Sequence, residues 1–553
     1  MSKVNTLNIV ALGGLQEIGK NITAFEYKDQ IVIVDCGMTF PTVEMLGVDI
    51  VIPDFQYLEK NRSKIKALLI THGHEDHIGA IPYFLKKIQV PIYATRLTAA
   101  LITNKLKEHK IEPDMHIVNY GDTVNLGPFK AEFICMGHSI PDTAAIILHT
   151  PVGIIVHTGD FKVDYTPVDG DVIDLGRLAE VGNKGVALLL ADSTNVERPG
   201  FTLSESTIGE TFMDLFSKAD GRIIVATFAS NVHRVQQIIT AAEKYGRYVA
   251  LSGRSMLNVV NTANDLGYLK MNPKTLIDIR QIQKYPENKV CLITTGSQGE
   301  PMSAMTRIAM GEHRNIKLNE RDTVIISAHP IPGNEDSVSV IINKLMEQGA
   351  KVIYDKLADV HVSGHACQEE LKLIHTLVKP KFFMPVHGET RHLLTHKKLA
   401  MQLGMPEENI FVQGIGDMME LTKKSMKHVG SVPHGSLLVD GLGVGDVGNI
   451  VLRDRKHLSE DGLIVVVMAI NEEYNEIMAG PDIFSRGFVY EKENEDLLEE
   501  ALQHVRKVVR RFTDKEEMTD INTMRNTIRD ELRKFIYNKI KRNPMILPII
   551  MEV

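Results

Sequence analysis

The sequence lacks the features of secreted, disulfide-bonded and membrane-spanning proteins. It has only four cysteines in 553 residues, and no two of them form a CxxC pair. Cysteines spaced this widely indicate reduced thiols and not a disulfide framework. No apolar run has membrane-spanning length, and the first residues lack the charged-then-apolar pattern of a signal peptide. We therefore expect a cytoplasmic protein that does not enter membranes.

The chain also lacks a surplus of positive charge. Its net charge is −8, whereas an enzyme that binds nucleic acid usually needs a positive track. This charge weakens the case for a nucleic-acid function without excluding it. The electrostatic field in the binding groove is local, and metal ions there can supply positive charge. The composition, 44% hydrophobic and 24% charged, is ordinary for a globular protein. The length predicts about two to four domains.

A histidine-rich segment follows one of the predicted strands. It reads His72-Gly73-His74-Glu75-Asp76-His77 and comes directly after the apolar run Ala67–Ile70. Imidazole nitrogens and carboxylate oxygens suit Zn²⁺ and, less tightly, Mn²⁺. Four ligand groups so close together can serve two ions about 3.5–4 Å apart, an arrangement that activates water against a phosphoester or acyl bond. The alternative is a surface loop that happens to be rich in histidine.

Three more ligand-type residues stand just after other predicted strands. His138, Asp160 and His387 each come within three residues of a strand end. Loops at strand ends can converge on one point, and a carboxylate such as that of Asp160 can bridge two cations. Any one of these residues alone would be interpreted as structural. Together with the histidine-rich segment they supply seven ligand-type groups for two ions, namely His72, His74, Asp76, His77, His138, Asp160 and His387.

The pattern of apolar residues divides the chain into parts. The first ~200 residues predict a mixed sheet sandwich covered by helices, with strands such as Ala67–Thr71 and helices such as Ile78–Lys87. From about Ser204 a regular alternation of strands and helices predicts a doubly wound α/β unit with a parallel sheet. Short strands then return at Lys351–Tyr354 and Phe382–Pro385. A Gly-rich connector that contains a few strands follows, roughly Gly414–Gly448. The tail then has two strands, Ile450–Leu452 and Gly462–Ala469, and two long helices near Asp496–Phe512 and Asp520–Tyr537.

These ligand positions resemble the motifs of the metallo-β-lactamase fold, in which HxHxDH precedes a later His, a Gly-Asp pair and a final His. The resemblance implies an αββα sandwich with the ions at its edge. By position it implies one ion held by His72, His74 and His138, a second held by Asp76, His77 and His387, and Asp160 as the bridge. Asp35 matches the family's early aspartate, which orients the ligand segment from behind. The alternative for Asp35 is a turn residue before Gly37.

A long insertion narrows the choice among families with this fold. Between Asp160 and His387 lie more than two hundred residues, which the α/β unit fills. The segments Asp192-Ser193-Thr194 and His361-Val362-Ser363-Gly364-His365 resemble motifs of the β-CASP nucleases, whose inserted domain clamps nucleic acid over the metals. That resemblance implies that Asp192 holds a ligand imidazole and that His365 contacts the scissile phosphate or protonates the leaving oxygen.

Five further segments resemble the bacterial ribonuclease J family, and the resemblance runs from about Val10 to the C-terminus. It implies a metal-dependent ribonuclease with 5′-to-3′ exonuclease and endonuclease activity, acting in RNA decay and in rRNA and mRNA processing. The implied partners are single-stranded RNA with a 5′-monophosphate and further subunits, in a homodimer, a tetramer or an assembly with a paralogue. The segments are Ala11–Asn21, His157–Lys162, Thr295–Pro301, Asn449–Arg455 and Arg542–Ile550.

We accordingly expect the following division of the chain: residues 1–205 and 351–415 form the metallo-β-lactamase domain, 206–350 the β-CASP domain, 416–449 a linker and 450–553 a C-terminal α+β domain. In the two-metal mechanism the ions activate a water molecule, and Asp76 and Asp160 accept or steer its proton. The metal is expected to be Zn²⁺, with Mn²⁺ or Mg²⁺ as alternatives.

Phosphate groups need donors beyond the metals. Ser230, Asn231 and His233 open a predicted helix, and helix N-termini bind anions through free N–H groups. Arg254 begins another predicted helix, where a capping surface residue is the alternative interpretation. The expected substrate contacts are Ser230, Asn231, His233, Arg254, His361, Val362, Ser363, Gly364 and His365.

Three other functions remain open. A small-molecule hydrolase of the same fold would not need so large an insertion. A DNA-processing β-CASP nuclease would not need a tail of the ribonuclease J type. A scaffold subunit without activity would be expected to lack a ligand, and none of the seven is missing.

Overall fold

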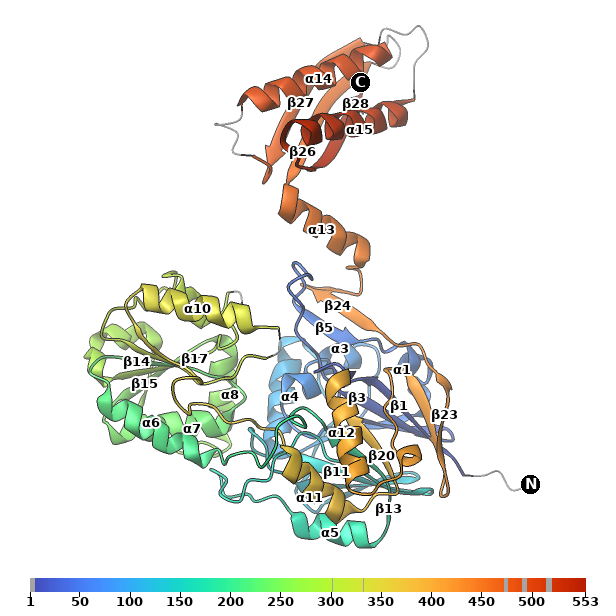
Figure 1. Cartoon of the computed structure of the whole chain (residues 1–553), viewed down its shortest axis with the longest axis vertical. Coiled ribbons are helices and arrows are strands. Elements are labelled where there is room, and N and C mark those ends of the chain that lie inside the picture. The colour runs from blue at the N-terminus through green and yellow to red at the C-terminus, as the bar shows by residue number, and fades with distance from the viewer. Residues whose placement is uncertain (1–4, 301, 332, 472–475, 490–494, 514–519) are drawn as a thin grey trace. The chain divides into compact units, whose positions relative to one another are not determined.

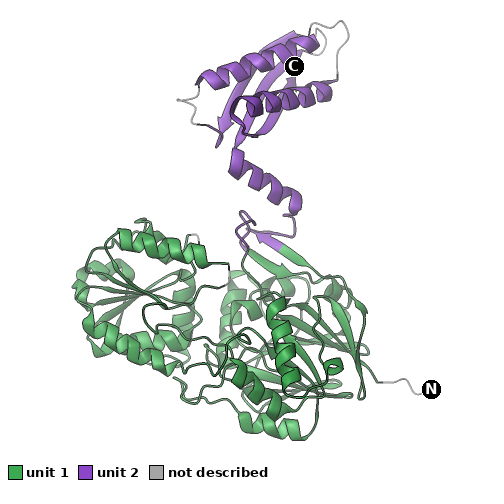
Figure 2. Cartoon of the chain, in the orientation of Figure 1, with its two compact units in different colours: residues 1–40, 50–437 green, residues 41–49, 438–553 purple. Residues whose placement is uncertain are grey.

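The computed structural model describes residues 5–300, 302–331, 333–471, 476–489, 495–513 and 520–553 (Figure 1). Two compact units make up the chain (Figure 2). Unit 1 comprises Met1–Phe40 and Ile50–Leu437, and unit 2 comprises Pro41–Asp49 and Leu438–Val553. No helix among the described residues is long and apolar enough to cross a membrane.

Unit 1 contains two sheets that pack face to face. The first sheet has the strand order β23-β22-β1-β3-β4-β6-β7-β8, and the second has the order β20-β13-β12-β11-β10-β9. In the same order, the strands of the first sheet span Met426–Ser431, Asp417–Leu421, Leu7–Gly13, Ile22–Tyr27, Gln30–Val34, Ile65–Leu69, Ile92–Ala94 and Met115–Ile117. The strands of the second span Phe382–Val386, Val186–Asp192, Gly153–His157, Ala144–Thr150, Phe129–Cys135 and Thr123–Leu126.

One apolar core lies between these sheets. Phe25 and Leu69 from the first sheet pack into the same buried cluster as Phe133, Ile146 and Leu188 from the second. A second cluster joins the outer face of the second sheet to helices α5 (Leu175–Asn183), α11 (Gln368–Val378) and α12 (Thr390–Gln402). Because each sheet face can bury its apolar side chains, the αββα sandwich predicted for this part of the chain is confirmed.

One of the helices associated with the first sheet, α2, contains part of the histidine-rich segment 72–77. They are α1 (Gln56–Lys60), α2 (Glu75–Ile78), α3 (Ile81–Leu85) and α4 (Arg96–Glu108). The single helix predicted over 78–87 is therefore wrong in its bounds. Gly79 and Ala80 separate two short helices, and Pro82 stands in the first turn of the second, where its missing N–H costs nothing.

The inserted part forms a parallel sheet with the order β16-β15-β17-β14-β18-β19. Figure 1 shows α6 and α7 on one side of this sheet and α10 on the other. The doubly wound α/β unit predicted from about Ser204 is thus confirmed. In sheet order its strands span Leu276–Ile277, Tyr248–Ser252, Val290–Thr294, Ile223–Ala226, Thr323–Ile326 and Lys351–Ile353, and its helices α6 to α10 span Ser206–Lys218, Val232–Lys244, Arg254–Asp265, Ala304–Ala309 and Glu335–Glu347.

Two boundaries differ from the expected ones. Strand β19 (Lys351–Ile353) pairs with β18 of the inserted sheet, although 351–415 was expected to belong to the sandwich. Strands β22 and β23 (417–421 and 426–431) lie in the first sheet, β22 beside β1, although 416–449 was expected to be a linker. The partner of β22 is far away in sequence, so local pattern could not reveal the sheet to which this short strand belongs. Strand β19 instead joins β18, the strand that precedes it in the chain, through α10.

Unit 2 ends in a three-stranded sheet of order β27-β26-β28, spanning Glu476–Arg486, Leu463–Asn471 and Met545–Glu552. Helices α14 (Glu495–Thr513) and α15 (Ile521–Ile540) cover one face of this sheet and form an apolar core with it. The predicted strand Ile450–Leu452 is wrong, because these residues lie in helix α13 (Asn449–Asp461). An apolar triplet has no period that separates helix from strand, and the helix ends at Gly462, whose φ of 76° suits glycine.

The other face of this three-stranded sheet carries apolar side chains that no described element of unit 2 covers. Val465 lies between Phe484 and Leu547 in the strand register, and Val467 pairs with Ile549. Phe484, Leu547 and Ile549 are exposed. We call this surface the open sheet face.

Short strands complete the fold. They are β2 (Leu15–Gln16), which pairs with β21 (Gly388–Glu389), together with β5 (Ile50–Pro53), β24 (Ser436–Asp440) and β25 (Gly443–Val444). The pairing of β2 with β21 holds the start of the chain against the segment that follows His387.

Candidate metal centre

The predicted ligands meet at one edge of the sandwich, each placed by the end of a strand. The segment 72–77 follows β6 of the first sheet, whereas His138, Asp160 and His387 follow β10, β12 and β20 of the second. The segment 72–77 is only partly a loop, because His74 is the residue before α2, and Asp76 and His77 lie within that helix. The four strands therefore bring together residues that are up to 315 positions apart.

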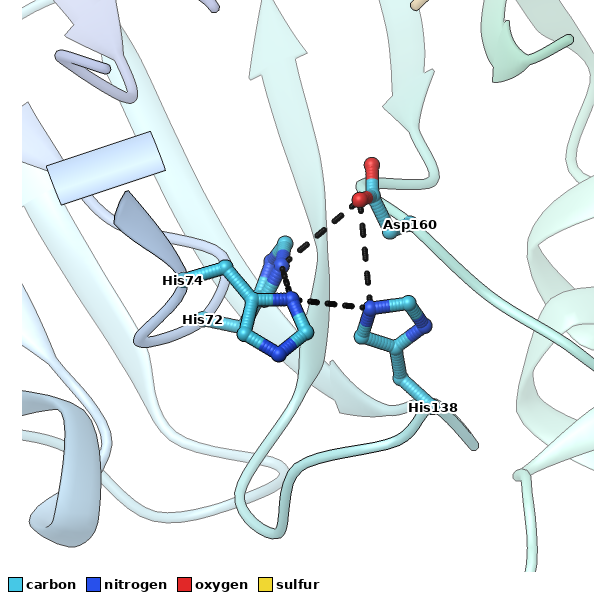
Figure 3. A group of neighbouring side chains, drawn as sticks. All are labelled: His72, His74, His138 and Asp160. Carbon is cyan, nitrogen blue, oxygen red and sulfur yellow. Dashed lines mark hydrogen bonds and ion pairs between the residues drawn. The ribbon is translucent and has the colours of Figure 1, made fainter. Parts of the chain in front are cut away.

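Four ligand atoms form a first cluster (Figure 3). His74 Nδ1 lies 3.0 Å from His72 Nε2 and 3.1 Å from His138 Nε2. Asp160 Oδ2 lies 3.7 Å from His72 Nε2 and 3.9 Å from His138 Nε2. Four ligands bound tetrahedrally at about 2.0–2.2 Å from one ion would lie about 3.3–3.6 Å apart. The cluster therefore has the dimensions of a tetrahedral cation site.

A second cluster shares Asp160 with the first. Asp160 Oδ2 lies 3.2 Å from His77 Nε2 and 3.5 Å from His387 Nε2. Asp76 Oδ2 lies 3.0 Å from His387 Nε2 and 3.5 Å from His77 Nε2. These four residues are the second group in the described chain whose ligand atoms converge on one point.

Asp160 is the residue common to both clusters. Its side chain is buried, and its Oδ1 atom has no hydrogen-bond partner among the described residues. Burial opposes ionisation of this carboxyl, but the imidazoles of His387 and His77 outweigh burial and hold its pKa well below the usual range. A buried carboxylate with an unpaired oxygen, surrounded by imidazoles, fits a donor set for divalent cations.

Hydrogen bonds behind two ligands of the first cluster determine which ring nitrogen points inward. His138 Nδ1 donates to the carbonyl oxygen of Gly364 at 2.7 Å, so its Nε2 carries the lone pair. Thr71 Oγ1 donates to Asp35, so it accepts from His72 Nδ1 at 3.0 Å. Both rings therefore present an unprotonated Nε2 to the centre, as a metal ligand must.

The second cluster is oriented in the same way. His77 Nδ1 donates to Asp35 Oδ2 at 2.8 Å, as expected for the early aspartate. His387 Nδ1 lies 2.7 Å from Thr194 Oγ1, which itself donates to the His387 carbonyl oxygen, so the ring donates to the hydroxyl. Asp35 and His387 have φ values of 62° and 53°, a conformation uncommon for residues other than glycine and typical of functional sites.

Glycines allow backbone segments to approach these ligands closely. A Cβ atom on Gly37 would lie 1.5 Å from the carbonyl oxygen of Asp76. A Cβ atom on Gly364 would lie 2.6 Å from the His138 ring. Any side chain at either position would displace the ligands.

Asp192 has a different partner from the expected one. Asp192 Oδ2 bonds His365 Nδ1 at 2.7 Å, whereas Asp192 Oδ1 is 3.7 Å from the ligand His387 and accepts from the Thr194 N–H instead. The His365 ring lies between the clusters, 5.2 Å from the His138 ring and 5.4 Å from the His387 ring, centroid to centroid. Burial alone would lower the pKa of His365, but the Asp192 carboxylate outweighs it and the pKa is raised.

The segment 361–365 is held by buried polar groups. Ser363 Oγ accepts from Asn195 Nδ2 at 2.8 Å, and Asn195 also donates to the carbonyl oxygen of His365. Arg234 is fully buried, pairs with Glu205, and donates to the carbonyl oxygens of Val360 and Val362 on either side of His361. His361 lies 3.4 Å from Arg234 Nη1.

The start of α7 is less free for phosphate than expected. Asn231 is buried and its side-chain oxygen caps the helix by accepting from the Arg234 N–H at 3.0 Å. His233 Nε2 bonds Asp169 Oδ2 at 2.8 Å. Ser230 is half-buried at the turn before the helix, and Arg254 is exposed at the first residue of α8. Arg234 joins α7 to the segment 361–365, while no contact among the described residues brings Arg254 to the centre.

Sequence reasoning missed four residues that orient the site. Thr71 and Thr194 stand directly beside predicted residues, so their position was the available signal. Asn21 Nδ2 lies 3.1 Å from His77 Nε2, and Asn21 ends the segment Ala11–Asn21. Arg234 follows the predicted phosphate-binding residues by one position, but only its burial shows that it is structural.

Four family profiles match the chain. The profile of the ribonuclease J beta-CASP domain matches residues 220–345, and that of the ribonuclease J C-terminal domain matches 450–553. The profile of the metallo-beta-lactamase superfamily matches 16–194, and that of the Zn-dependent metallo-hydrolase RNA specificity domain matches 350–413.

Curated relatives are similar over the whole length. The chain is 43% identical to ribonuclease J2 of Bacillus subtilis, with 100% of both chains covered. It is 45% identical to ribonuclease J 1 of Streptococcus pyogenes, covering 99% of this chain and 98% of that one. It is 44% identical to ribonuclease J of Thermus thermophilus, covering 99% and 95%.

A solved structure shares the fold. It is the crystal structure of a protein of unknown function from Enterococcus faecalis V583, with a TM-score of 0.53 and 16% identity, covering 75% of this chain and 100% of that one. At this identity the likeness concerns the fold alone.

Removal of the shared carboxylate should weaken both cation sites. We expect Asp160→Ala to lower the bound zinc from two ions per chain to one or none, because the variant loses a ligand of each cluster at once. Asp169→Asn, which changes a carboxylate of the same loop that bonds His233 instead, should keep both ions. Native mass spectrometry of the zinc-loaded proteins measures the stoichiometry. Two tightly held ions in Asp160→Ala would show that this residue does not bridge them.

Proposed function

The chain belongs to the ribonuclease J family and is a metal-dependent ribonuclease, and we propose that it trims single-stranded RNA from the 5′ end and also cuts internally. The observation that carries this proposal is the pair of ligand clusters sharing Asp160, with the Asp192–His365 pair beside them. Such an activity would act in RNA decay and in the processing of rRNA and mRNA.

The two clusters assign ligands to two ions. His72, His74 and His138 would hold one ion, Asp76, His77 and His387 would hold the other, and Asp160 would bridge them. Zn²⁺ suits this mixture of imidazoles and carboxylates best, whereas Mn²⁺ and Mg²⁺ accept the same ligands less tightly or with other geometries. When bound, such ions lower the pKa of a water molecule and neutralise charge on the scissile phosphate.

The protein's own groups would position and move protons. Asp76 and Asp160 would steer the proton of the attacking water, since Asp160 belongs to both ligand clusters and Asp76 to the second. His365 donates its Nδ1–H to Asp192, which leaves Nε2 to contact the scissile phosphate or to protonate the leaving 3′ oxygen. Asp192 keeps this ring in one orientation and favours its charged form.

Recognition of the RNA end would use the segment 361–365 and the starts of two helices. Ser363 and Gly364 would offer a hydroxyl and a backbone N–H to phosphate, together with His361, Val362 and His365. Ser230, Asn231 and His233 would contribute at the start of α7, where the capping by Asn231 leaves Ser230 as the most available donor. Arg254 would contact the RNA backbone only if the RNA extends from the centre along the inserted domain.

The open sheet face supports a proposal about assembly. We propose that the protein forms homodimers or tetramers, or pairs with a paralogue, through this face of the C-terminal domain. The exposed side chains Phe484, Leu547 and Ile549 mark a surface that a partner covers. We further propose a cytoplasmic location, which the four free cysteines support because a reducing compartment keeps thiols unpaired.

The function is tested with one end-labelled RNA that carries either a 5′-monophosphate or a 5′-triphosphate. We expect release of mononucleotides that a chelator abolishes, and a rate at least about tenfold higher for the monophosphate, the effect of roughly 1.4 kcal/mol in the transition state. Internal cuts that ignore the 5′ end would point to an endonuclease alone. Absence of cleavage with every divalent metal would reject the ribonuclease proposal for this chain.

Truncation of His365 should separate catalysis from metal binding. We expect His365→Ala to keep two ions and to lose about 10²–10⁴-fold in kcat, because its ring moves a proton without holding a metal. Asp192→Asn should keep the ions and lose less activity, and His428→Ala, an exposed histidine of β23, should behave as the parent. Single-turnover cleavage and metal analysis measure the two properties separately. Full activity of His365→Ala would contradict its role.

A charged side chain introduced on the open sheet face should weaken the association of subunits. We expect Ile549→Asp to shift the mass in solution toward the 61.7 kDa of one chain, because a buried unpaired carboxylate is costly at an interface. Tyr537→Asp places the same charge on exposed α15 of the same domain and should leave the mass unchanged. Sedimentation velocity measures both, and an unchanged assembly of Ile549→Asp would move the interface elsewhere.

A further inference from the structure

Three large apolar side chains stand exposed where the sandwich passes into the inserted domain. Tyr165 is 61% exposed, Phe201 55% and Leu203 60%. We call these three residues the apolar strip. Exposed aromatic side chains are few in the described chain, and two of them belong to this strip. Large apolar side chains gathered at one exposed place indicate a contact surface.

Hydrogen bonds bring the two segments of the strip side by side. Ser204 Oγ donates to the carbonyl oxygen of Thr166 and accepts from Thr166 Oγ1, both at 3.0 Å. Lys162 Nζ donates to the carbonyl oxygen of Leu203 at 3.3 Å, and the N–H of Glu205 donates to Asp164 Oδ2 at 3.0 Å. Segment 162–166 therefore lies along segment 203–205.

Hydrogen bonds join the two segments of the strip to the residues around His365. Thr202, between Phe201 and Leu203, donates its hydroxyl to the carbonyl oxygen of His365 at 2.8 Å. Glu370 is fully buried and accepts from the N–H groups of Thr202 and Val163, both at 2.7 Å. One carboxylate thus holds both segments of the strip, and one hydroxyl places them next to His365.

The packing does not require apolar residues at these positions. Thr202 is half-buried and bonds inward to His365 and Glu370, whereas Phe201 and Leu203 on either side of it are exposed. Arg198, which is exposed, lies three residues before Phe201, and Lys162 donates to the carbonyl oxygen of Leu203. Aromatic rings next to cations are the combination that binds single-stranded nucleic acid.

We infer that Tyr165, Phe201 and Leu203 form a stacking platform for the unpaired bases next to the scissile phosphate. This inference rests on the proposed ribonuclease function. Stacking on an aromatic ring accepts any base, since every base has a π-face, so the platform would hold the RNA without reading its sequence. It would keep the strand extended over His365 while the phosphate enters the centre.

The chain contains no tryptophan, so Phe201→Trp would carry its only indole. We expect the fluorescence of the metal-loaded Phe201→Trp protein to be quenched on titration with a ten-nucleotide 2′-O-methyl RNA, whose integrity during the titration is checked by gel electrophoresis. Tyr248→Trp is the control. It places the indole at the beginning of β15, whereas α7 and α8 start at the opposite end of the parallel strands, and its fluorescence should not change.

Truncation of the ring should weaken binding of the same RNA. We expect Phe201→Ala to raise the Kd roughly 5- to 100-fold, the range that alanine substitution of a stacked aromatic produces, while Phe201→Trp stays near the parent. The loss should be the same at low and high salt, whereas Arg198→Ala should flatten the dependence on salt. Abasic RNA should bind the parent as weakly as it binds Phe201→Ala, because base and ring are lost from the same contact.

The outcomes separate this inference from the proposed function. A parent that neither binds nor cleaves RNA would reject the function itself. A parent that binds and cleaves, together with an unchanged Kd for Phe201→Ala or an unquenched Phe201→Trp, would overturn the platform alone. A change in the mass of Phe201→Ala in solution, with no change in Kd, would assign the strip to a protein contact and overturn it as well.

Discussion

The carboxylate of Asp160 is the constraint on which the rest of the centre depends. It is buried at the meeting point of imidazoles from three other strand ends, and burial of an ion without compensation is among the costliest arrangements in a protein. The neighbouring histidines lower its pKa, yet one of its oxygens has no partner among the described residues. Divalent cations bound here would resolve this arrangement, and metal binding would then stabilise this edge of the protein.

The centre is built from both sides of the sandwich, and the insertion completes it. Asp35 and Thr71 orient His77 and His72 from the first sheet, while Thr194 orients His387 from the second. The chain returning from the inserted domain adds the carbonyl oxygen of Gly364, which orients His138, and the ring of His365. The ring of His365 and the last orienting group therefore come from the chain that leaves the inserted domain, so the proposed RNA binding and catalysis would be structurally coupled.

The same connection accounts for the apolar strip. Segment 162–166 leaves the bridging Asp160, segment 201–205 enters the inserted domain, and Glu370 holds both. A substrate that lies on this strip would touch the exit from one domain and the entrance to the other. The buried pair of Arg234 and Glu205 then ties α7 to the segment on either side of His361, so the position of the platform follows from the same buried polar groups that place His365.

The sequence by itself determined the two-layer sandwich, the parallel inserted sheet and the identity of the seven ligand-type residues. Apolar runs that end in a histidine or an aspartate are local signals, and the spacing of His72, His74 and His77 needs no distant partner to be recognised. Tertiary structure alone decided the placement of β22, whose partner β1 is far away in sequence. It also decided that Asp192 bonds His365 and that Thr194 bonds His387, because a hydrogen bond between residues almost two hundred positions apart depends on where two loops meet. Local pattern records which residues can bind a metal, but only the packing of two sheets and an inserted domain decides which atoms face it.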